Sequence, residues 1–389
     1  MISPTQAKIA ADRQDGMLLP EGVQQDFCLP QGSYLLSHSV GRPLRRASEV
    51  FARQFFTPWQ QGEAEPWPDW LTVITGFRQA LARLFYDDAE HFCPQVNLSS
   101  ALSKILLSHP RLARRPHILL SEQDFPSMGF VMQQAPEHAQ LRFIPRNADI
   151  TDVNVWLDQF TAQTDLLFIS QVYSNTGQRA PVAQLVAEAR ARGIITVVDV
   201  AQSAGVIPLD LSVTDADFVI GSCVKWLCGG PGAGFLWGNP AMLPQCTPRD
   251  VGWFSHAEPF EFDIHHFVAE QNALKFWGGT PSIAPFVLAA DSIAYMARLG
   301  DKVYQHNQTL LDKLHSLVGE YLISPMARDK RSGTAVIHTL DDQRLLTLLQ
   351  QAGMSVDLRA AGVRVSPHIY TREAEIDKLA WLLAKVKHC

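Results

Sequence analysis

The sequence contains no long run of apolar residues, no segment rich in Lys and Arg, and no C-x-x-C pair of cysteines. No uninterrupted apolar stretch could span a bilayer, and residues 1–16 are too polar for a signal peptide. The formal net charge of -6 provides no general attraction to nucleic acid or to anionic lipid. We therefore expect a cytoplasmic protein that binds neither nucleic acid nor membrane.

The six cysteines are scattered without any C-x-x-C pair, which argues against a zinc ribbon and against a disulfide framework. We expect them to be buried free thiols. The histidines show no H-E-x-x-H spacing, and the adjacent His265 and His266 would point to opposite faces of a strand. We therefore assign no metal site.

The chain has the length and the apolar content of a folded enzyme. Its 389 residues, 47% of them hydrophobic and 19% charged, suffice for a large domain and a smaller one. From about residue 70 to 240, short apolar runs alternate with amphipathic stretches, as expected of βα units around a mainly parallel sheet. The expected strands are 117–121, 141–144, 166–170, 194–200, 218–222 and 234–237, and the expected helices are 97–108, 127–134 and 182–192.

The pattern changes after residue 240. Residues 240–280 are rich in aromatic residues, proline and glycine without a clear period, so we expect a long irregular segment over the carboxyl edge of the sheet. Two long helices, 283–299 and 303–322, and an α+β pattern follow. The expected parts are an N-terminal segment (1–45) near the active site and the small domain, a large domain (46–280), and a small C-terminal domain with linking helices (281–389).

Two polar residues stand where open α/β sheets bind their ligands. Asp199 lies at the end of a strongly β-branched strand, and Lys225 follows the next expected strand, just before a Gly-rich turn. The carboxyl ends of parallel strands share one edge of the sheet, so both side chains can face the same crevice. The Gly-rich turn precedes a strand and lacks the G-K-[ST] ending of a nucleotide-binding loop.

A carboxylate and a lysine in one crevice are what a pyridoxal 5'-phosphate (PLP) enzyme needs. The pyridine ring of PLP stores electrons well only when its nitrogen is protonated, and a carboxylate such as Asp199 would keep that proton in place. The lysine must react as a neutral amine to form a Schiff base, and a partly desolvated site beside other cations lowers its pKa. We therefore predict that Lys225 is the catalytic residue that carries PLP.

From about residue 35 to 370, the ordered motifs resemble the class V aminotransferase family of fold-type I PLP enzymes, especially its kynureninase-like and cysteine-desulfurase-like members. The strongest are Asp199-x-x-Gln202 and Ser222-x-x-Lys225. The resemblance implies that Asp199 meets the pyridine nitrogen, that Gln202 lies by the ring and its phenolic oxygen, and that Ser222 contacts the phosphate. It also implies a mainly parallel central sheet wrapped by helices, with a small α+β C-terminal domain.

Further cofactor-binding candidates match the family in order. Ser99 and Ser100 open a helix, where free N–H groups and the helix dipole suit a phosphate. Phe125 matches the aromatic residue that stacks on the cofactor ring, where kynureninases have Phe and desulfurases have His. Asn175 follows a strand as the family's Asn-containing turn does, and the alignment leaves Ser174 as the other candidate for this contact.

The segment from Trp277 to Pro281 resembles the family segment whose threonine reaches the phosphate of the neighbouring subunit. The resemblance therefore implies a homodimer in which Thr280 enters the partner's active site, with Trp277 as a further cofactor-binding candidate. Structural alternatives remain for several candidates: Ser99 and Ser100 as helix caps, Phe125 as core packing and Arg364 as a solvated strand residue.

The resemblance also implies a set of substrate-binding residues. Arg364 matches an arginine that binds the substrate carboxylate, and a planar guanidinium suits a carboxylate in a bidentate manner. The family's N-terminal segment lines the mouth of the site, which makes Tyr34, His38 and Ser39 candidates as well.

The chain departs from each subgroup at positions that bear on the reaction. Residues 354–363 contain no cysteine, whereas desulfurases with an acceptor thiol carry one there, and Val224 and Gln202 replace the Tyr and His of kynureninases. We predict an enzyme that acts on a small amino acid through an external aldimine, with kynureninase-like lyase or hydrolase cleavage at the β-carbon. The alternatives are a class V aminotransferase or epimerase, an activity like that of cysteine desulfurase or selenocysteine lyase, and a catalytically silent relative that binds a metabolite.

Overall fold

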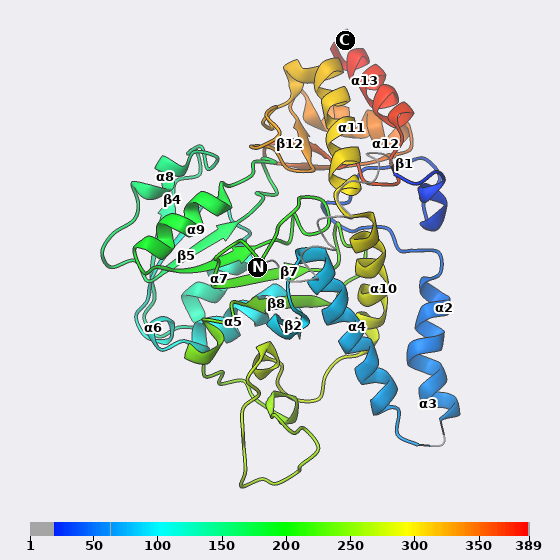
Figure 1. The fold of residues 1–389 in the computed structure, drawn as a ribbon. Coiled ribbons are helices and arrows are strands. Elements are labelled where there is room, and N and C mark those ends of the chain that lie inside the picture. The colour runs from blue at the N-terminus through cyan, green and yellow to red at the C-terminus, as the bar shows by residue number, and fades with distance from the viewer. Residues whose placement is uncertain (1–18, 63, 388–389) are drawn as a thin grey trace, which may run out of the picture.

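A seven-stranded sheet forms the centre of the molecule (Figure 1). The computed structural model describes residues 19–62 and 64–387, so residues 1–16, expected to be polar, and Cys389 lie outside the described residues. The strand order is β2-β8-β7-β6-β5-β3-β4, and all neighbours from β7 to β4 run parallel. The strands are β2 (Phe92–Gln95), β3 (His117–Ser121), β4 (Gln140–Ile144), β5 (Leu166–Ser170), β6 (Ile195–Asp199), β7 (Phe218–Ser222) and β8 (Gly234–Gly238).

Both faces of the sheet are covered by helices because its strands are apolar on both sides. Leu167 and Ile169 of β5 belong to one core, while Leu166 and Phe168, which alternate with them, belong to the other. The helices of the first core are α2 (Ala47–Phe51), α4 (Trp67–Phe85), α8 (Val153–Leu157), α9 (Val182–Ala191) and α10 (Ala284–Leu299). Those of the second are α5 (Leu98–Ser108), α6 (Pro110–Ala113) and α7 (Pro126–Gln134).

The six strands expected from the sequence are all present, each within one residue of its expected ends. Strand β2 was not predicted: it has four residues, contains Pro94 and lies at the edge of the sheet, where a missing N–H donor is tolerated. Helix α4 was not predicted either, nor was the helical stretch before it, which comprises α2 (Ala47–Phe51), the π-helical turn Ala52–Phe56 and α3 (Thr57–Gln61).

The irregular segment 240–280 takes a different course from the expected one. It contains only short 3-10 turns, as its composition indicates, but it begins at the amino edge of the sheet. The reason is that β8 runs antiparallel to β7, with Gly238 paired to Phe218, so the chain leaves β8 at the opposite edge. Only its end returns to the carboxyl edge, where the Gln95 side chain donates to the Phe276 carbonyl at 3.2 Å.

A smaller α+β unit follows α10 and lies at the top of Figure 1. Its antiparallel sheet has the order β11-β12-β9 and packs with three helices around a core of its own. The strands are β9 (Ala335–Ile337), β11 (Asp357–Arg359) and β12 (Gly362–Val365), and the helices are α11 (Lys302–Val318), α12 (Asp342–Gln351) and α13 (Glu373–Lys387).

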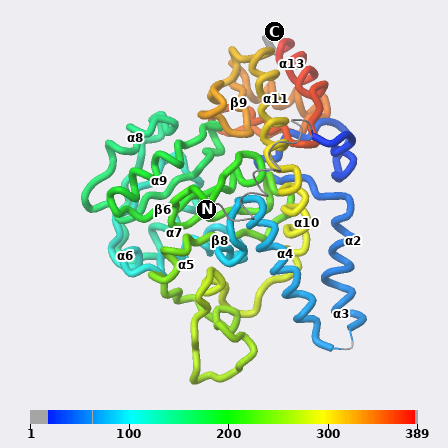
Figure 2. Tube along the Cα trace, in the orientation of Figure 1, coloured from blue at the N-terminus to red at the C-terminus, as the bar shows by residue number. Residues whose placement is uncertain are grey.

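The N-terminal segment joins this smaller unit although it is far away in the sequence. Strand β1 (Ser33–Tyr34) pairs in parallel with β10 (Met354–Ser355), and Figure 2 shows the blue segment beside the orange and red one. The domain boundaries at residues 45 and 280 stay a prediction. Within the described part of the chain, no helix combines the length and the hydropathy that a membrane crossing requires.

Four of the described cysteines are buried, Cys28 is half-buried, and none of these five forms a disulfide. This agrees with the expected free thiols for the part of the chain that the structure covers.

Gly41 is a point of close contact between the N-terminal segment and the turn that carries Lys225. Its N–H donates to the Val224 carbonyl at 2.8 Å, and a Cβ at this position would lie 2.0 Å from the Lys225 carbonyl oxygen. We expect Gly41→Ala to destabilise the protein by about 1–3 kcal/mol, because the backbone must shift to make room. Denaturant unfolding measures this change in the free energy of unfolding.

Gly76, inside α4, is the matched control, since a Cβ there meets nothing within 4 Å. Gly76→Ala should leave the free energy of unfolding unchanged or raise it by up to about 1 kcal/mol, through helix propensity. Equal stabilities of the two variants would contradict the close contact at Gly41.

Candidate active site

The carboxyl ends of neighbouring strands bring the two central predicted residues together. β6 ends at Asp199 and β7 at Ser222, and the two strands pair with Asp199 opposite Ile220. Lys225 lies in the turn after β7, and Lys225 and Asp199 are close enough that each changes the pKa of the other. The sheet thus places a carboxylate and an amine in one crevice.

Asp199 is a buried carboxylate with an unmet need for a partner. Burial raises its pKa to about 6, against the opposing effects of the Ala201 N–H and of Lys225. Its Oδ1 accepts from that N–H at 2.7 Å, and no side chain of a described residue donates to it. A buried carboxylate is stable in its charged form only when it is paired, so this position fits a cationic N–H donor such as a protonated pyridine nitrogen.

Lys225 is held in a setting that favours the neutral amine. Burial lowers its pKa, Asp199 acts in the opposite direction, and Arg364 lowers it further. No described residue forms a hydrogen bond or an ion pair with its amine. The N-terminal segment lies close by, since the side-chain amide of Gln202 donates to the His38 carbonyl at 3.1 Å. A buried amine with a lowered pKa, such as that of Lys225, can act as a nucleophile.

The start of α5 provides free donors for an anion. Asn97 caps the helix, and its Oδ1 accepts from the Ser100 N–H at 2.8 Å. Among the described residues, no acceptor meets the N–H groups of Leu98 and Ser99, and the side chains of Ser99 and Ser100 are half-exposed. The helix end therefore fits the phosphate expected there, and the roles of the two serines stay a prediction.

Phe125 and the turn after β5 lie at the same edge of the sheet. Phe125 is the residue before α7, and its side chain is 59% exposed, which is unusual for a phenylalanine that only fills a core. Asn175 is exposed, whereas the Ser174 carbonyl accepts from Arg364 Nη1 at 3.0 Å. The geometry leaves both Ser174 and Asn175 as candidates for the cofactor contact.

Trp277 and Thr280 lie together in a shallow hollow beside the edge strand β2. Trp277 is half-buried and packs edge-on against Phe254 at 4.9 Å between ring centroids, while Thr280 is exposed. The ammonium of Lys104 donates to the carbonyls of Phe276 and Trp277 at 2.8 and 2.9 Å and so fixes this segment to α5.

The expected substrate arginine is already paired within the chain. Arg364 is buried on β12, opposite Asp357 on β11, and its Nε and Nη2 both donate to the Asp357 carboxylate. Asp357 also accepts from His38 at 2.8 Å. Burial acts to raise the pKa of Asp357, but its bonds with His38 and Arg364 hold that pKa well below the usual range. The sequence alone did not single out Asp357.

The other residues of the expected mouth also bond within the chain. Burial lowers the pKa of His38, and its Nδ1 lies 2.5 Å from the Ser366 hydroxyl, so both of its ring nitrogens are engaged. The Tyr34 hydroxyl donates to the Val40 carbonyl at 2.5 Å, and Ser39 is exposed. Their roles in substrate binding stay a prediction.

A second buried carboxylate, which the sequence analysis did not identify, lies beside Asp199. Asp124 accepts from the Ser170 hydroxyl at 2.6 Å and from the Ser121 N–H at 2.7 Å. Burial raises its pKa to about 7, and the charge of Asp199 acts in the same direction. Its place between a buried strand and a helix start, next to Phe125, is a signal that the sequence does contain.

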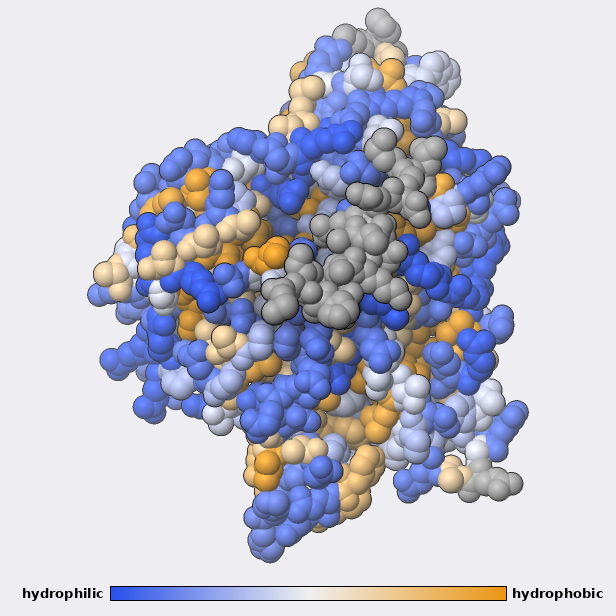
Figure 3. Space-filling model, in the orientation of Figure 1, coloured by the Kyte–Doolittle hydropathy of each residue, from blue (hydrophilic) through white to orange (hydrophobic). Residues whose placement is uncertain are grey.

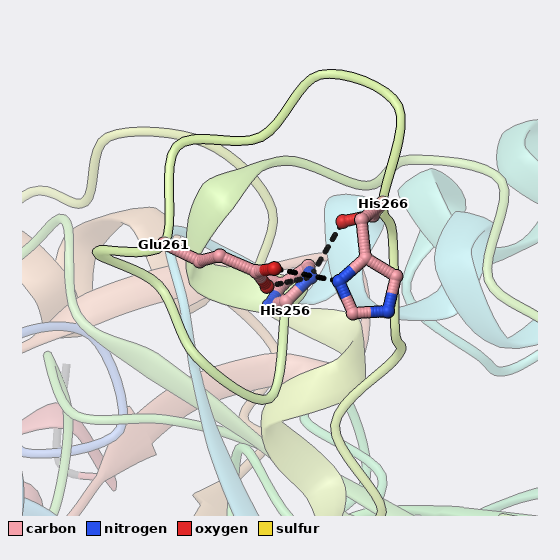
Figure 4. A group of neighbouring side chains, drawn as sticks. All are labelled: His256, Glu261 and His266. Atoms are coloured by element: carbon pink, nitrogen blue, oxygen red, sulfur yellow. Dashed lines mark hydrogen bonds and ion pairs between the residues drawn. The ribbon is translucent and has the colours of Figure 1, made fainter.

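Three side chains in the described part of the chain are close enough to be tested as metal ligands: His256, Glu261 and His266 (Figure 4). The Nδ1 of His256 accepts from the Glu258 N–H at 2.8 Å, which leaves the proton on Nε2, 2.9 Å from the His266 carbonyl. A metal on Nε2 would need the opposite tautomer. We therefore interpret the group as a set of hydrogen bonds and ion pairs that stabilises the loop. The absence of a metal stays a prediction.

Comparison with known proteins gives matches over most of the chain. The aminotransferase class-V family model matches residues 98–379. Isopenicillin N epimerase from Streptomyces clavuligerus is 30% identical over 329 residues, which cover 78% of this chain and 82% of that protein. Kynureninase from Deinococcus radiodurans is 28% identical over 350 residues, which cover 85% of this chain and 83% of that protein.

Solved structures match with low sequence identity but with a closely similar fold. A cysteine desulfurase from Thermococcus onnurineus NA1 has a TM-score of 0.83 at 19% identity, covering 95% of this chain and 98% of that chain. A C-DES variant with glycine covalently linked to its PLP cofactor has a TM-score of 0.83 at 21% identity, covering 94% of this chain and 99% of that chain.

The Asp124 carboxyl makes the stability of the cofactor-free protein depend on pH. Its pKa is about 7 in the folded protein and ordinarily 3.8, so its stabilising contribution is present below about pH 4 and is lost as the pH rises toward 7. We expect Asp124→Asn, which removes this titration, to gain about 1–3 kcal/mol relative to the parent protein between about pH 5 and about pH 8. Denaturant unfolding at both pH values measures the gain.

The exposed Asp158 provides a control for this experiment, because it lies outside the crevice. Asp158→Asn should show the same pH dependence of stability as the parent protein. If Asp124→Asn also follows the parent protein at both pH values, Asp124 does not bind its proton more tightly in the folded state.

Proposed function

Because this chain belongs to the class V aminotransferase family of PLP-dependent enzymes, we propose that it acts on a small amino acid and cleaves a bond at the β-carbon, as a lyase or hydrolase. The comparisons confirm four predictions from the sequence: the family, the fold-type I architecture, the enzymatic nature of the protein and its PLP cofactor. The choice of reaction is supported by the features described below.

The observation that carries the proposal is the burial of Asp199 and Lys225 at the ends of two adjacent parallel strands. When bound, the cofactor supplies an electron sink for a bond broken at the α-carbon of an amino acid. Asp199 would hold a proton on the ring nitrogen. Lys225 would hold the cofactor through its amine and would move protons at the reacting carbons.

The remaining cofactor-binding residues would orient the ring and hold the phosphate. Ser99 and Ser100, at the free end of α5, and Ser222, at the end of β7, would bind the phosphate. Phe125 would lie against the ring face, while Gln202 and either Ser174 or Asn175 would approach its phenolic oxygen, with Trp277 at the side of the site.

Arg364 would bind the substrate carboxylate, and Tyr34, His38 and Ser39 would line the entrance.

The turn between β11 and β12 argues against persulfide transfer of the desulfurase kind. Arg359 pairs with Gly362, so the hairpin turn consists of Ala360 and Ala361 and leaves no room for a loop that carries a cysteine. The relatives named kynureninase support cleavage at the β-carbon instead. Val224 and Gln202 differ from the Tyr and His of kynureninases, which argues for a substrate other than kynurenine.

Epimerisation is the second candidate, because a relative named isopenicillin N epimerase is 30% identical to the chain. An epimerase exchanges only the proton at the α-carbon, whereas cleavage at the β-carbon releases a new compound. Transamination is the third candidate and needs a keto acid as amino acceptor. A single product assay therefore separates the three reactions.

We also propose that the enzyme is a homodimer in which Thr280 reaches the partner's active site. The irregular segment that ends at Thr280 projects from the body of the molecule, and hydrophobic side chains reach its surface (Figure 3). Its most exposed apolar residues are Phe262, at 75%, and Ile264, at 92%. A monomer rarely exposes such a cluster, and a second copy of the chain would cover it.

The reaction is tested by incubating the PLP-loaded protein with a panel of amino acids. Cleavage at the β-carbon predicts alanine or pyruvate together with the released side-chain fragment, and epimerisation predicts only inversion at the α-carbon. Transamination predicts a keto acid that keeps the whole carbon skeleton of the substrate and forms only when an added keto acid accepts the amino group. Lys225→Ala should lower turnover at least about a thousandfold. Borohydride should fix the cofactor on the peptide that contains Lys225.

Lys330, exposed and outside the crevice, provides the control, so Lys330→Ala should keep its turnover. Full turnover by Lys225→Ala, or a parent protein that takes up no PLP, would contradict the proposed function.

The dimer is tested at the projecting segment. We expect the double variant Phe262→Asp, Ile264→Asp to be a monomer in light scattering, because burying two carboxylates would oppose association. Val213→Asp, at an equally exposed apolar residue elsewhere (77%), should remain a dimer. A dimeric double variant would show that this segment does not form the interface.

A further inference from the structure

We propose that Asp357 is a positioning residue for substrate recognition: it holds the Arg364 guanidinium from the side and leaves the outer N–H groups of that arginine to bind the substrate carboxylate. This inference rests on the proposed function, in which Arg364 binds the carboxylate of an amino acid. It adds a residue that acts through Arg364 and does not itself touch the substrate.

The hydrogen bonds of Arg364 show how its donors are divided. A guanidinium has five N–H donors in a fixed plane. Nε and Nη2 each donate one hydrogen to the two oxygens of Asp357, and Nη1 donates one to the Ser174 carbonyl. One hydrogen therefore remains on each of the two terminal nitrogens, and a second carboxylate can accept from this pair.

Asp357 is itself fixed by a chain of hydrogen bonds. As an ionised carboxylate it only accepts, so the proton between it and His38 lies on His38 Nε2. The Nδ1 of His38 then accepts from the Ser366 hydroxyl, which in turn lies 2.8 Å from the Thr334 hydroxyl. Each group has a definite donor and acceptor role, so the chain holds Asp357 in one orientation.

Burial explains why the arginine needs this support. The Arg364 side chain is 5% exposed, and an unpaired guanidinium at such a site would be poorly solvated whenever no substrate is bound. Asp357, with a side chain that is 28% exposed, compensates the charge of the Arg364 guanidinium and fixes the plane of this group. A guanidinium that is already held in place loses little side-chain freedom when the substrate binds, which favours binding.

The experiment compares two probes that differ only in a carboxylate: glycine and methylamine. Both are titrated into the PLP-loaded protein, and the change in cofactor absorbance gives each dissociation constant. We expect Asp357→Asn and Asp357→Ala to weaken glycine binding by about 10- to 100-fold and methylamine binding by less than about 3-fold. Thermal melting verifies that the variants are folded.

Two further variants complete the test. Asp312→Asn is the matched control, because Asp312, like Asp357, is a carboxylate paired with arginine, here Arg328 and Arg331, but lies on α11 away from the crevice. Glycine binding by this variant should not change. His38→Leu removes the N–H donor to Asp357 and should weaken glycine binding in the same direction by a smaller factor, again with less effect on methylamine binding. It also keeps the test open if the Asp357 variants do not fold.

Unchanged glycine binding in the Asp357 variants would overturn this inference and leave the proposed function standing. Tighter glycine binding would overturn it as well, because Asp357 would then compete with the substrate carboxylate for the Arg364 guanidinium. A parent protein that shows no spectral response to either amine would overturn the proposed function and the inference together.

Discussion

The burial of opposite charges at one edge of a parallel sheet is the constraint on which the rest of the structure depends. A carboxylate and an amine taken out of water lose several kcal/mol of solvation each, so such a site persists only where every charged group has a partner or awaits one. Asp199, at the end of β6, and Lys225, in the turn after β7, influence each other's pKa but form no ion pair, so each is free to bind the cofactor. The same principle applies to the free N–H groups of α5, which are the proposed phosphate site, and to the paired Arg364, which is the proposed site for the substrate carboxylate.

The sequence predicted those parts of the fold that depend on local pattern. The apolar runs of β3, β5 and β7 and the motifs around Asp199 and Lys225 are short-range signals, and both the strands and the family were predicted from them. The direction of β8 depends on its antiparallel pairing with β7 and with β2, a strand far away in the chain, so the course of the segment after β8 was predicted wrongly. The edge strand β2 was missed because a proline interrupts its four residues.

The candidate site shows the same limit. Residues that match an ordered motif could be named from the sequence, but the buried environments of two neighbouring acidic residues, Asp124 and Asp357, could not be predicted from it. Asp357 meets Arg364 only because β11 and β12 form a hairpin, and it meets His38 only because the N-terminal segment packs against the smaller unit. Asp124 acquires its character from burial beside Asp199, which depends on the assembled sheet. Side-chain environment of this kind arises from tertiary contacts and is not encoded in any one segment.

The course of the N-terminal segment gives the site a mechanical property. Tyr34 is paired with the smaller unit through β10, and seven residues later Gly41 bonds to the backbone beside Lys225. This stretch is a short tether between the two parts of the enzyme, with His38 near its middle. Rotation of the smaller unit, which carries Arg364, would therefore be transmitted through this stretch to the backbone turn of Lys225.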